Sequence, residues 1–231
     1  MADFRWLLGS TGRLTHSFAS DLLVDAIPMK LSRLILASAS PRRSELLRGL
    51  GQRFAVVASD AGELESEHLT ARELSLVNAH RKARAVAKRH PDATVLGADT
   101  VVSTELRIYG KPRDREEAFG MLTALQGRTH QVITGVCLVH LREHRERLFA
   151  EITEVRFRDL DGAAIRRYLE RVNPLDKAGG YAIQEHGDWI IEEISGSFTN
   201  VIGLPIERLE FELESWEDAG AGTMPQEGVN R

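Results

Sequence analysis

The segment LASASPRRSELL (residues 36–47) places two serines, a proline and two adjacent arginines between an apolar run and a leucine-bearing segment. The apolar run RLILAS (residues 33–38) predicts a buried strand. Pro41 suits the first position of a helix, and Gly51 predicts where that helix stops. Ligands of open α/β sheets bind beyond the carboxyl ends of the strands, which is where this turn lies.

The first turn of this helix carries two cations at the end where the helix dipole disfavours them. An anion would stabilise Arg42 and Arg43, and Ser40 is placed to cap the helix. Free backbone N–H groups, both guanidinium groups and the hydroxyls of Ser38 and Ser40 together suit a polyphosphate. The alternative is a surface helix with solvated arginines, and the strand–turn–helix context favours the anion site.

The rest of the chain alternates between helix and strand patterns. Strands are predicted at FAVVAS (54–59), TVLGADTVVS (94–103), YAIQ (181–184) and DWIIEEI (188–194), with HQVITGVCLVHL (130–141) and ERLFAEITEVRF (146–157) paired around the turn REHR. Helices are predicted at residues 41–51, 70–91, 114–127, 161–172 and 204–213; capping boxes begin two of them, Thr70 with Glu73 and Asp114 with Glu117. This mixture indicates an α/β protein with a mixed sheet.

The composition limits the class of protein. The chain has 231 residues, 42% of them hydrophobic and 28% charged, which is enough for one domain or one two-lobed domain. Its net charge of −4 argues against a dedicated nucleic-acid-binding protein, which normally carries a basic excess. Cys137 is the only cysteine, so we expect neither a disulfide framework nor a cysteine-based zinc site, and a reducing cytosol fits.

The two ends of the chain differ from the segment between them. No stretch approaches the roughly 20 apolar residues that a membrane span requires, and the beginning lacks the apolar core of a signal peptide. We expect residues 1–30 to form an extension that is unstructured, or not translated because Met29 is the functional start. We expect a single domain over residues 31–216 and a flexible tail, rich in Gly and polar residues, over residues 217–231.

One carboxylate stands inside an apolar run. Asp99 lies in VLGADTVV, so we expect it close to a desolvated sheet, where it needs a metal, a lysine or a catalytic task. Gly97 before it allows close backbone approach, and Thr100 after it offers a hydroxyl. The alternative, a turn-forming aspartate at a strand end, does not require the apolar flanks.

For other charged residues the sequence gives weaker support for a functional role. Lys111, between Gly110 and Pro112, can neutralise phosphate as a point charge, or it is an exposed loop lysine. Glu63 or Glu65, in the acidic run before the long helix, can help to hold a divalent cation, or the run is a solvated loop. Lys82 lies among other basic residues, which by itself indicates no more than a basic helix face.

Two glycine-rich segments, DKAGGYAIQEHG (176–187) and ISGSFTNVIGLP (194–205), allow a backbone to approach a ligand closely. Gln184 has a paired donor and acceptor that suit the edge of a nucleobase. Tyr181 can stack on a base, although a buried core tyrosine is the commoner role.

Taken together, the motifs of this chain resemble those of the Maf family of nucleoside triphosphate pyrophosphatases. The resemblance rests on LASASPRRSELL, KARAVA, VLGADTVV, GKPRD, TGV, PLDKAGGYAIQ and GSFTNVIGLP, in the family's order, from about residue 34 to residue 209. It implies one Maf-like catalytic domain over residues 31–216, with a two-lobed α/β fold, a mixed sheet, flanking helices and a central cleft, similar to inosine triphosphate pyrophosphatases.

The resemblance also implies roles for individual residues. Asp99 matches the proton acceptor that activates water, Ser38, Arg42 and Arg43 match the phosphate-binding motif, and Glu63, Lys82 and Lys111 fall on further active-site positions. Positions that sort substrates match Arg42, Thr100 and Gln184, and the YAIQ form is similar to the subgroup acting on dTTP and UTP. Metal ligation is implied for Glu63 and Asp99, with Glu65 and Asp60 as alternatives to Glu63 and with Asp99 as either base or ligand.

The activity implied by the resemblance is hydrolysis of a nucleoside triphosphate to a monophosphate and pyrophosphate, in housecleaning of the nucleotide pool. A divalent metal ion, Mg²⁺ or Mn²⁺, a cytoplasmic location and a homodimer are implied with it, and neither nucleic acid nor a membrane is expected as a partner. The alternative is a nucleotide-binding regulator of cell division and septum formation, although no charge run or apolar stripe identifies a surface for a division partner.

Overall fold

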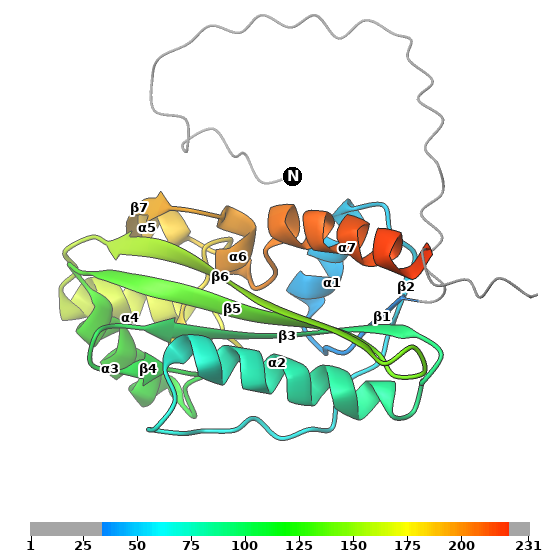
Figure 1. The fold of residues 1–231 in the computed structure, drawn as a ribbon. Helices are drawn as coiled ribbons and strands as arrows, with labels where there is room; N and C mark the ends of the chain where they lie inside the picture. The colour runs from blue at the N-terminus through cyan, green and yellow to red at the C-terminus, as the bar shows by residue number, and fades with distance from the viewer. Residues whose placement is uncertain (1–33, 222–231) are drawn as a thin grey trace, which may run out of the picture.

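Three long strands form the centre of one mixed sheet in the computed structural model of the protein (Figure 1). The structure describes residues 34–221, so the extension predicted over residues 1–30 lies outside the described residues. Strand order is β2-β1-β3-β5-β6-β7, with β4 paired to β3. The strands are β1 (Leu34–Leu36), β2 (Phe54–Val56), β3 (Thr94–Ser103), β4 (Ile108–Tyr109), β5 (Thr129–His140), β6 (Arg145–Phe157) and β7 (Ile191–Ser195).

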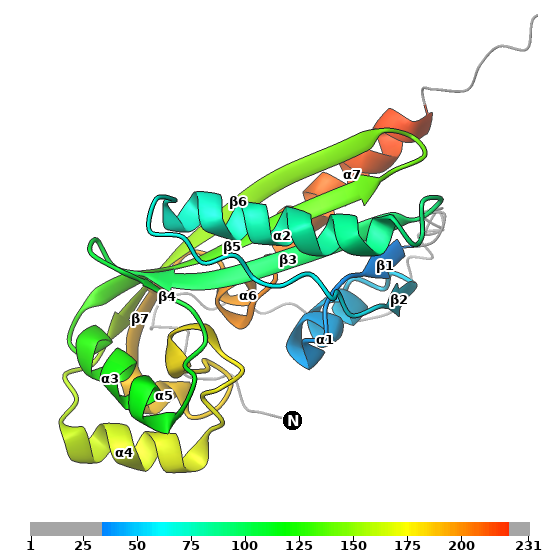
Figure 2. The same ribbon diagram turned by 90° about the horizontal axis from the view of Figure 1, so that it is seen from below.

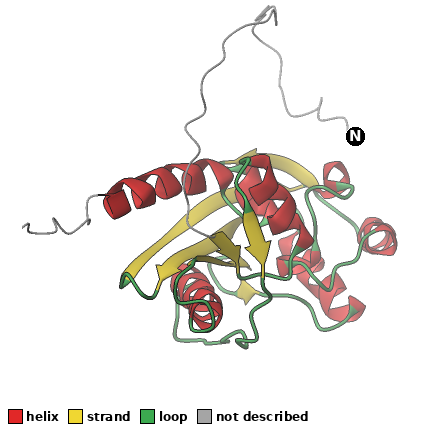
Figure 3. Ribbon diagram, turned by 90° about the vertical axis from the view of Figure 1, so that its right-hand side faces the viewer, coloured by secondary structure: helices red, strands yellow, loops and turns green. Residues whose placement is uncertain are grey.

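Helices cover both faces of this sheet, as Figure 3 shows. They are α1 (Pro41–Gly49), α2 (Ala71–Ala87), α3 (Arg115–Leu125), α4 (Gly162–Arg171), the 3₁₀ turn η2 (Ala178–Gly180), α5 (Gly187–Ile190), α6 (Phe198–Ile202) and α7 (Ile206–Ala221). Strand β1 pairs in parallel with β2 and β3, and the remaining pairs are antiparallel. The predicted α/β fold with a mixed sheet and flanking helices is confirmed. Among the described residues, no helix is both long and apolar enough to span a membrane.

The long strands belong to two lobes at once. At one end, β3 and β5 contribute Leu96 and Leu138 to a core that α1 and α7 complete; at the other end, Val102 and Val132 enter a core built with α3 and α4. Helix α2 covers the opposite face of the first end, where Cys137 is fully buried. Figure 2 shows α3, α4 and α5 gathered at one end of the sheet, apart from α1. The predicted two-lobed arrangement is therefore present.

Most local signals at the helix starts and at the hairpin are confirmed. The Thr70 side chain accepts a hydrogen bond from the Glu73 N–H, and the Glu73 carboxylate accepts one from the Thr70 N–H, as a capping box requires. At the start of α3 only half of the predicted box is present: the Asp114 carboxylate accepts a hydrogen bond from the N–H of Glu117, but the Glu117 carboxylate accepts one from the N–H of Arg113 and not from that of Asp114. Strands β5 and β6 pair from His140 opposite Arg145, so the hairpin is present and its turn, at residues 141–144, lies one position before the predicted turn.

The prediction of a strand at residues 181–184 is wrong. Gly179 and Gly180 take φ values of +71° and +75° and turn the chain away from an extended path. The backbone of Ala182 then pairs with the hydroxyl of Tyr168, which donates to its carbonyl at 3.2 Å and accepts from its N–H at 2.9 Å. Because a side chain satisfies these backbone groups, no neighbouring strand is needed.

Several boundaries differ from the sequence pattern: β2 ends at Val56 where the pattern predicts position 59, and α2 ends at Ala87 where it predicts position 91. The segment predicted as one strand at residues 188–194 begins inside the short helix α5 and becomes strand β7 only at Ile191. Helix α7 continues to Ala221, past position 217, where the pattern predicts the start of the tail. Residues 222–231 lie outside the described part of the chain.

Candidate active site

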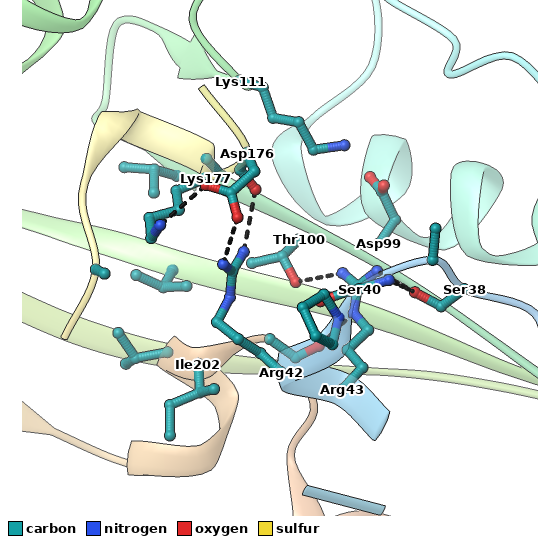
Figure 4. A pocket seen from close by; sticks show the side chains of 18 of the residues that line it. Ser38, Ser40, Arg42, Arg43, Asp99, Thr100, Lys111, Asp176, Lys177 and Ile202 are labelled. Carbon is teal, nitrogen blue, oxygen red and sulfur yellow. Dashed lines mark hydrogen bonds and ion pairs between the residues drawn. The ribbon is translucent and has the colours of Figure 1, made fainter. Parts of the chain in front are cut away.

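A cleft of about 490 Å³ lies beyond the carboxyl end of β1, between the two lobes. Residues from the turn before α1, the loop before α2, β3, and the segments around η2 and α6 line it (Figure 4). Nine side chains that the sequence analysis selected come together here: Ser38, Arg42, Arg43, Glu63, Lys82, Asp99, Thr100, Lys111 and Gln184. Its alternative acids Glu65 and Asp60 do not join them. Segments far apart in the sequence thus form one site.

An alternating chain of charges runs along one wall of the cleft. The Lys82 ammonium lies 2.6 Å from Oδ1 of Asp99 and 2.8 Å from Oε1 of Glu63. The Lys111 ammonium lies 2.8 Å from the same Glu63 oxygen. Asp99 is only 5% exposed and stands in the middle of β3, opposite Gly135 of β5, so the turn interpretation of Asp99 is wrong. Its partner in the desolvated sheet is a lysine.

Two glycines explain why a lysine on α2 reaches an aspartate on β3. A Cβ atom added at Gly97 would lie 2.4 Å from the Ala79 carbonyl oxygen, and one added at Gly135 would lie 2.4 Å from the Ser75 carbonyl carbon. Helix α2 therefore packs with its backbone directly on β3 and β5, closer than any side chain would permit. This approach buries most of Lys82, whose side chain is 13% exposed, beside Asp99.

The carboxylate of Glu63 is strongly held in its ionised form. Burial opposes ionisation, but hydrogen bonds from Lys111 and Lys82 outweigh it and lower the pKa of Glu63 to about 2. Neither of the alternative acids enters the cleft: Glu65 is not among its lining residues, and Asp60 pairs with Arg89 at the surface. Of the three acids considered from the sequence, Glu63 alone shares the cleft with Asp99.

Arg43 is half-buried against uncharged acceptors. Its guanidinium donates to the Gly203 carbonyl at 2.8 Å, to Oγ1 of Thr100 at 2.9 Å and to Oγ of Ser38 at 3.4 Å. Burial lowers the pKa of Arg43, and the negative charge of Asp99 opposes that shift. Because none of the carboxylates in residues 34–221 pairs with it, Arg43 brings a cation to the Asp99 side of the cleft.

Arg42 is bound by a residue that the sequence analysis missed. Its guanidinium donates to Oδ2 of Asp176 at 2.7 Å and to the Asp176 carbonyl at 3.0 Å. Ser40 occupies the N-cap position of α1 without a side-chain capping bond, and its N–H donates to Oγ of Ser38. A signal for Asp176 did exist, since an acid and a lysine side by side stand in PLDKAG.

The opposite wall of the cleft is mainly apolar. Tyr181, Ile183, Val132 and Ile202 line it together with Gln184. Tyr181 is buried, and its hydroxyl lies 2.8 Å from Nε2 of His130. Burial lowers the pKa of His130 to about 4, so the imidazole is neutral at pH 7. Apolar side chains with one amide beside them suit a nucleobase.

A model of the family described as Maf-like protein matches residues 33–216. The chain belongs to the Maf family. Within this family, it is 43% identical to the dTTP/UTP pyrophosphatase of Carboxydothermus hydrogenoformans, over 80% of this chain and 98% of that protein. It is 49% identical to the dTTP/UTP pyrophosphatase of Akkermansia muciniphila, over 75% of this chain and 90% of that protein.

Among solved structures, the Ham1 protein of Staphylococcus aureus aligns with 80% of this Maf chain and with 99% of its own chain. Their sequence identity is 16% and the TM-score is 0.49, a likeness from which we draw no conclusion about activity. The prediction that the chain belongs to the Maf family is confirmed.

Proposed function

We propose that this protein hydrolyses dTTP and UTP between the α and β phosphates and releases a nucleoside monophosphate and pyrophosphate. The observation that carries this proposal is the charge chain from Asp99 through Lys82 and Glu63 to Lys111, in the same cleft as both arginines. The names of the two relatives support the choice of substrates. The apolar wall with Gln184 suits the base of such a nucleotide.

This arrangement supports the following reaction. A water molecule attacks a phosphorus atom of the α–β anhydride, and Asp99 accepts its proton as the bond to the bridging oxygen breaks. Lys82 positions the Asp99 carboxylate from 2.6 Å. Arg43 and Lys111 stabilise the negative charge that develops on the phosphate oxygens. If water attacks the α phosphorus, pyrophosphate leaves with the bridging oxygen and the monophosphate contains the oxygen of water. If water attacks the β phosphorus, the monophosphate leaves with the bridging oxygen and pyrophosphate contains the oxygen of water.

The donor set fits a divalent cation that enters with the nucleotide. Among the described residues, no cluster of three or more His, Cys, Asp or Glu side chains could hold a metal ion without the substrate. Mg²⁺ commonly binds one or two carboxylates together with substrate phosphates, and Glu63 and Asp99 supply two carboxylates in one cleft. Bound there, Mg²⁺ or Mn²⁺ would neutralise phosphate charge and polarise the anhydride.

The direct test is release of pyrophosphate from each common nucleoside triphosphate, with Mg²⁺ or Mn²⁺ present and then with both removed by EDTA. We expect turnover concentrated on dTTP and UTP, equimolar monophosphate and pyrophosphate, and loss of turnover in EDTA. Release of inorganic phosphate in place of pyrophosphate would contradict cleavage at the α–β bond.

We expect Asp99→Asn to lower kcat by about 10²–10⁴-fold, because the amide cannot accept the proton of water. The affinity for nucleotide measured without a divalent cation should change little, since phosphate and base contacts remain. Asp60→Asn is the matched control, because Asp60 lies outside the cleft and pairs with Arg89. Full activity of Asp99→Asn would remove Asp99 from the role of base.

We also propose the homodimer and the cytoplasmic location that the family resemblance implies. Light scattering on the purified protein measures the first, and microscopy of a tagged protein in the cell measures the second. A monomer at micromolar concentration would contradict the proposed dimer.

A further inference from the structure

Arg42 and Asp176 form an ion pair across the cleft. Arg42 lies in the first turn of α1, and Asp176 lies in the loop between α4 and η2, 134 positions later in the chain. The guanidinium contacts both the carboxylate and the backbone carbonyl of Asp176. Two contacts to one residue fix the plane of the guanidinium as well as its position.

Asp176 is itself held by a buried cation. Lys177, only 5% exposed, places its ammonium 2.9 Å from Oδ1 of Asp176 and 3.1 Å from Oε1 of Glu185. The same ammonium donates to the Asn173 carbonyl at 2.8 Å. Burial opposes the ionisation of Asp176, but hydrogen bonds from Lys177 and Arg42 outweigh it, and the pKa of Asp176 is lowered. The carboxylate is therefore charged and fixed before any nucleotide binds.

The two adjacent arginines consequently have different surroundings. Arg43 donates to three uncharged oxygens, whereas the charge of Arg42 is compensated by Asp176. Figure 4 shows the two side chains diverging, with Arg42 directed to Asp176 and Arg43 directed to Thr100 and Ser38. Arg43 is thus suited to phosphate, while Arg42 is drawn to the loop that continues into Gln184.

We propose that Asp176 is a positioning residue that holds Arg42 beside the Gln184 loop, where Arg42 selects the nucleoside and does not join the cations around the triphosphate. The inference rests on the proposed function, because it concerns selection within that reaction. Lys177 extends the arrangement, since its contact with Glu185 fixes the residue next to Gln184. One buried lysine thereby connects Asp176, which lines the cleft, with the residue that follows Gln184.

The test compares kcat and KM for UTP and CTP in the wild type and in Asp176→Asn. We expect KM for UTP to rise about tenfold and the UTP preference in kcat/KM to fall about tenfold, the size of one lost charged hydrogen bond, while kcat for UTP changes less than about threefold. Asp92→Asn is the matched control, because it removes a carboxylate from a surface pair with Arg142. An unchanged preference in Asp176→Asn would overturn the proposal.

A double-mutant comparison separates positioning from direct contact. If Asp176 acts through Arg42, adding Asp176→Asn to Arg42→Ala should change the preference no further. An additional loss in the double variant would overturn the proposal. Asp176→Glu, which keeps the charge, should retain most of the preference, and equal loss in Asp176→Glu and Asp176→Asn would count against the ion pair. Should Asp176→Asn not unfold cooperatively, Asp176→Ser removes the carboxylate with a smaller side chain and carries the same expectation.

Binding of methylene-bridged UTP and CTP analogues, measured by calorimetry, gives the same comparison without turnover. Absence of pyrophosphate release by the wild type with every nucleotide would overturn the proposed function alone, because the change in binding preference caused by Asp176→Asn still tests the role of Asp176.

Discussion

One oxygen of the Glu63 carboxylate accepts hydrogen bonds from two ammonium groups, so the pKa of Glu63 differs between the folded and the unfolded chain. The folded pKa of about 2 lies below the ordinary value of 4.5, so the unfolded chain binds more protons between these two values. The stabilising contribution is therefore complete above about pH 5 and is lost as the pH falls towards 2. At 43% exposure, solvent screens part of it.

We expect the difference in unfolding free energy between wild type and Glu63→Gln to shrink as the pH is lowered from 6 to 3. Urea unfolding at a series of pH values measures it. Glu65→Gln provides the control, because Glu65 lies in the same loop but does not line the cleft, and its unfolding should follow the wild type at every pH. A difference that grows on acidification would contradict the ion pairs of Glu63.

At the scale of elements, the contact of α2 with the sheet sets the geometry of the reaction. Gly97→Ala would force α2 away from β3, because the new methyl carbon would overlap the Ala79 carbonyl. We expect a loss of about 1–3 kcal/mol in stability from overpacking. We also expect kcat to fall, since Lys82 would move relative to Asp99. Urea unfolding and pyrophosphate release measure the two effects.

Gly120→Ala serves as the control for this substitution. Gly120 lies inside α3, and a Cβ atom there meets nothing within 4 Å. Because alanine restricts the unfolded chain, we expect a gain of about 0.4–1 kcal/mol with unchanged kcat. If Gly97→Ala behaved like Gly120→Ala, the close packing of α2 would not control the site.

Elements with local signals could be predicted from the sequence, and elements fixed by distant partners could not. The capping box at Thr70 and the hairpin between β5 and β6 are determined by neighbouring residues. The strand expected at residues 181–184 is a loop because its backbone bonds to the side chain of Tyr168, which no local pattern reveals.

The candidate site shows the same division. Asp99 could be selected because an acid in an apolar run is conspicuous, whereas Lys82 stands among other basic residues. Only the packing of α2 separates Lys82 from its neighbours and directs it to Asp99. Asp176 was missed because its partner lies 134 positions away, and no periodicity connects the two.

For the whole molecule, binding of a nucleotide should be visible as stability. A ligand at 100 times its Kd adds about 2.7 kcal/mol, which for a protein of this length raises Tm by about 5–11 °C. We expect this shift with a methylene-bridged UTP analogue and Mg²⁺, measured by calorimetric scanning. Uridine at the same concentration should give a much smaller shift, because it lacks the phosphates that face Arg43 and Lys111. Equal Tm shifts with uridine and with the UTP analogue would mean that the base, and not the phosphates, makes the main contacts with the protein.

The passage of β3, β5 and β6 through both lobes has a mechanical consequence. An enzyme whose two lobes are joined by flexible linkers can close like a hinge. Here three adjacent hydrogen-bonded strands cross the boundary between the lobes. Bending them would strain many ladder bonds together, so the floor of the cleft is stiff. We therefore expect Asp99 and Thr100, which stand on β3 at the floor of the cleft, to keep their places when nucleotide enters and leaves.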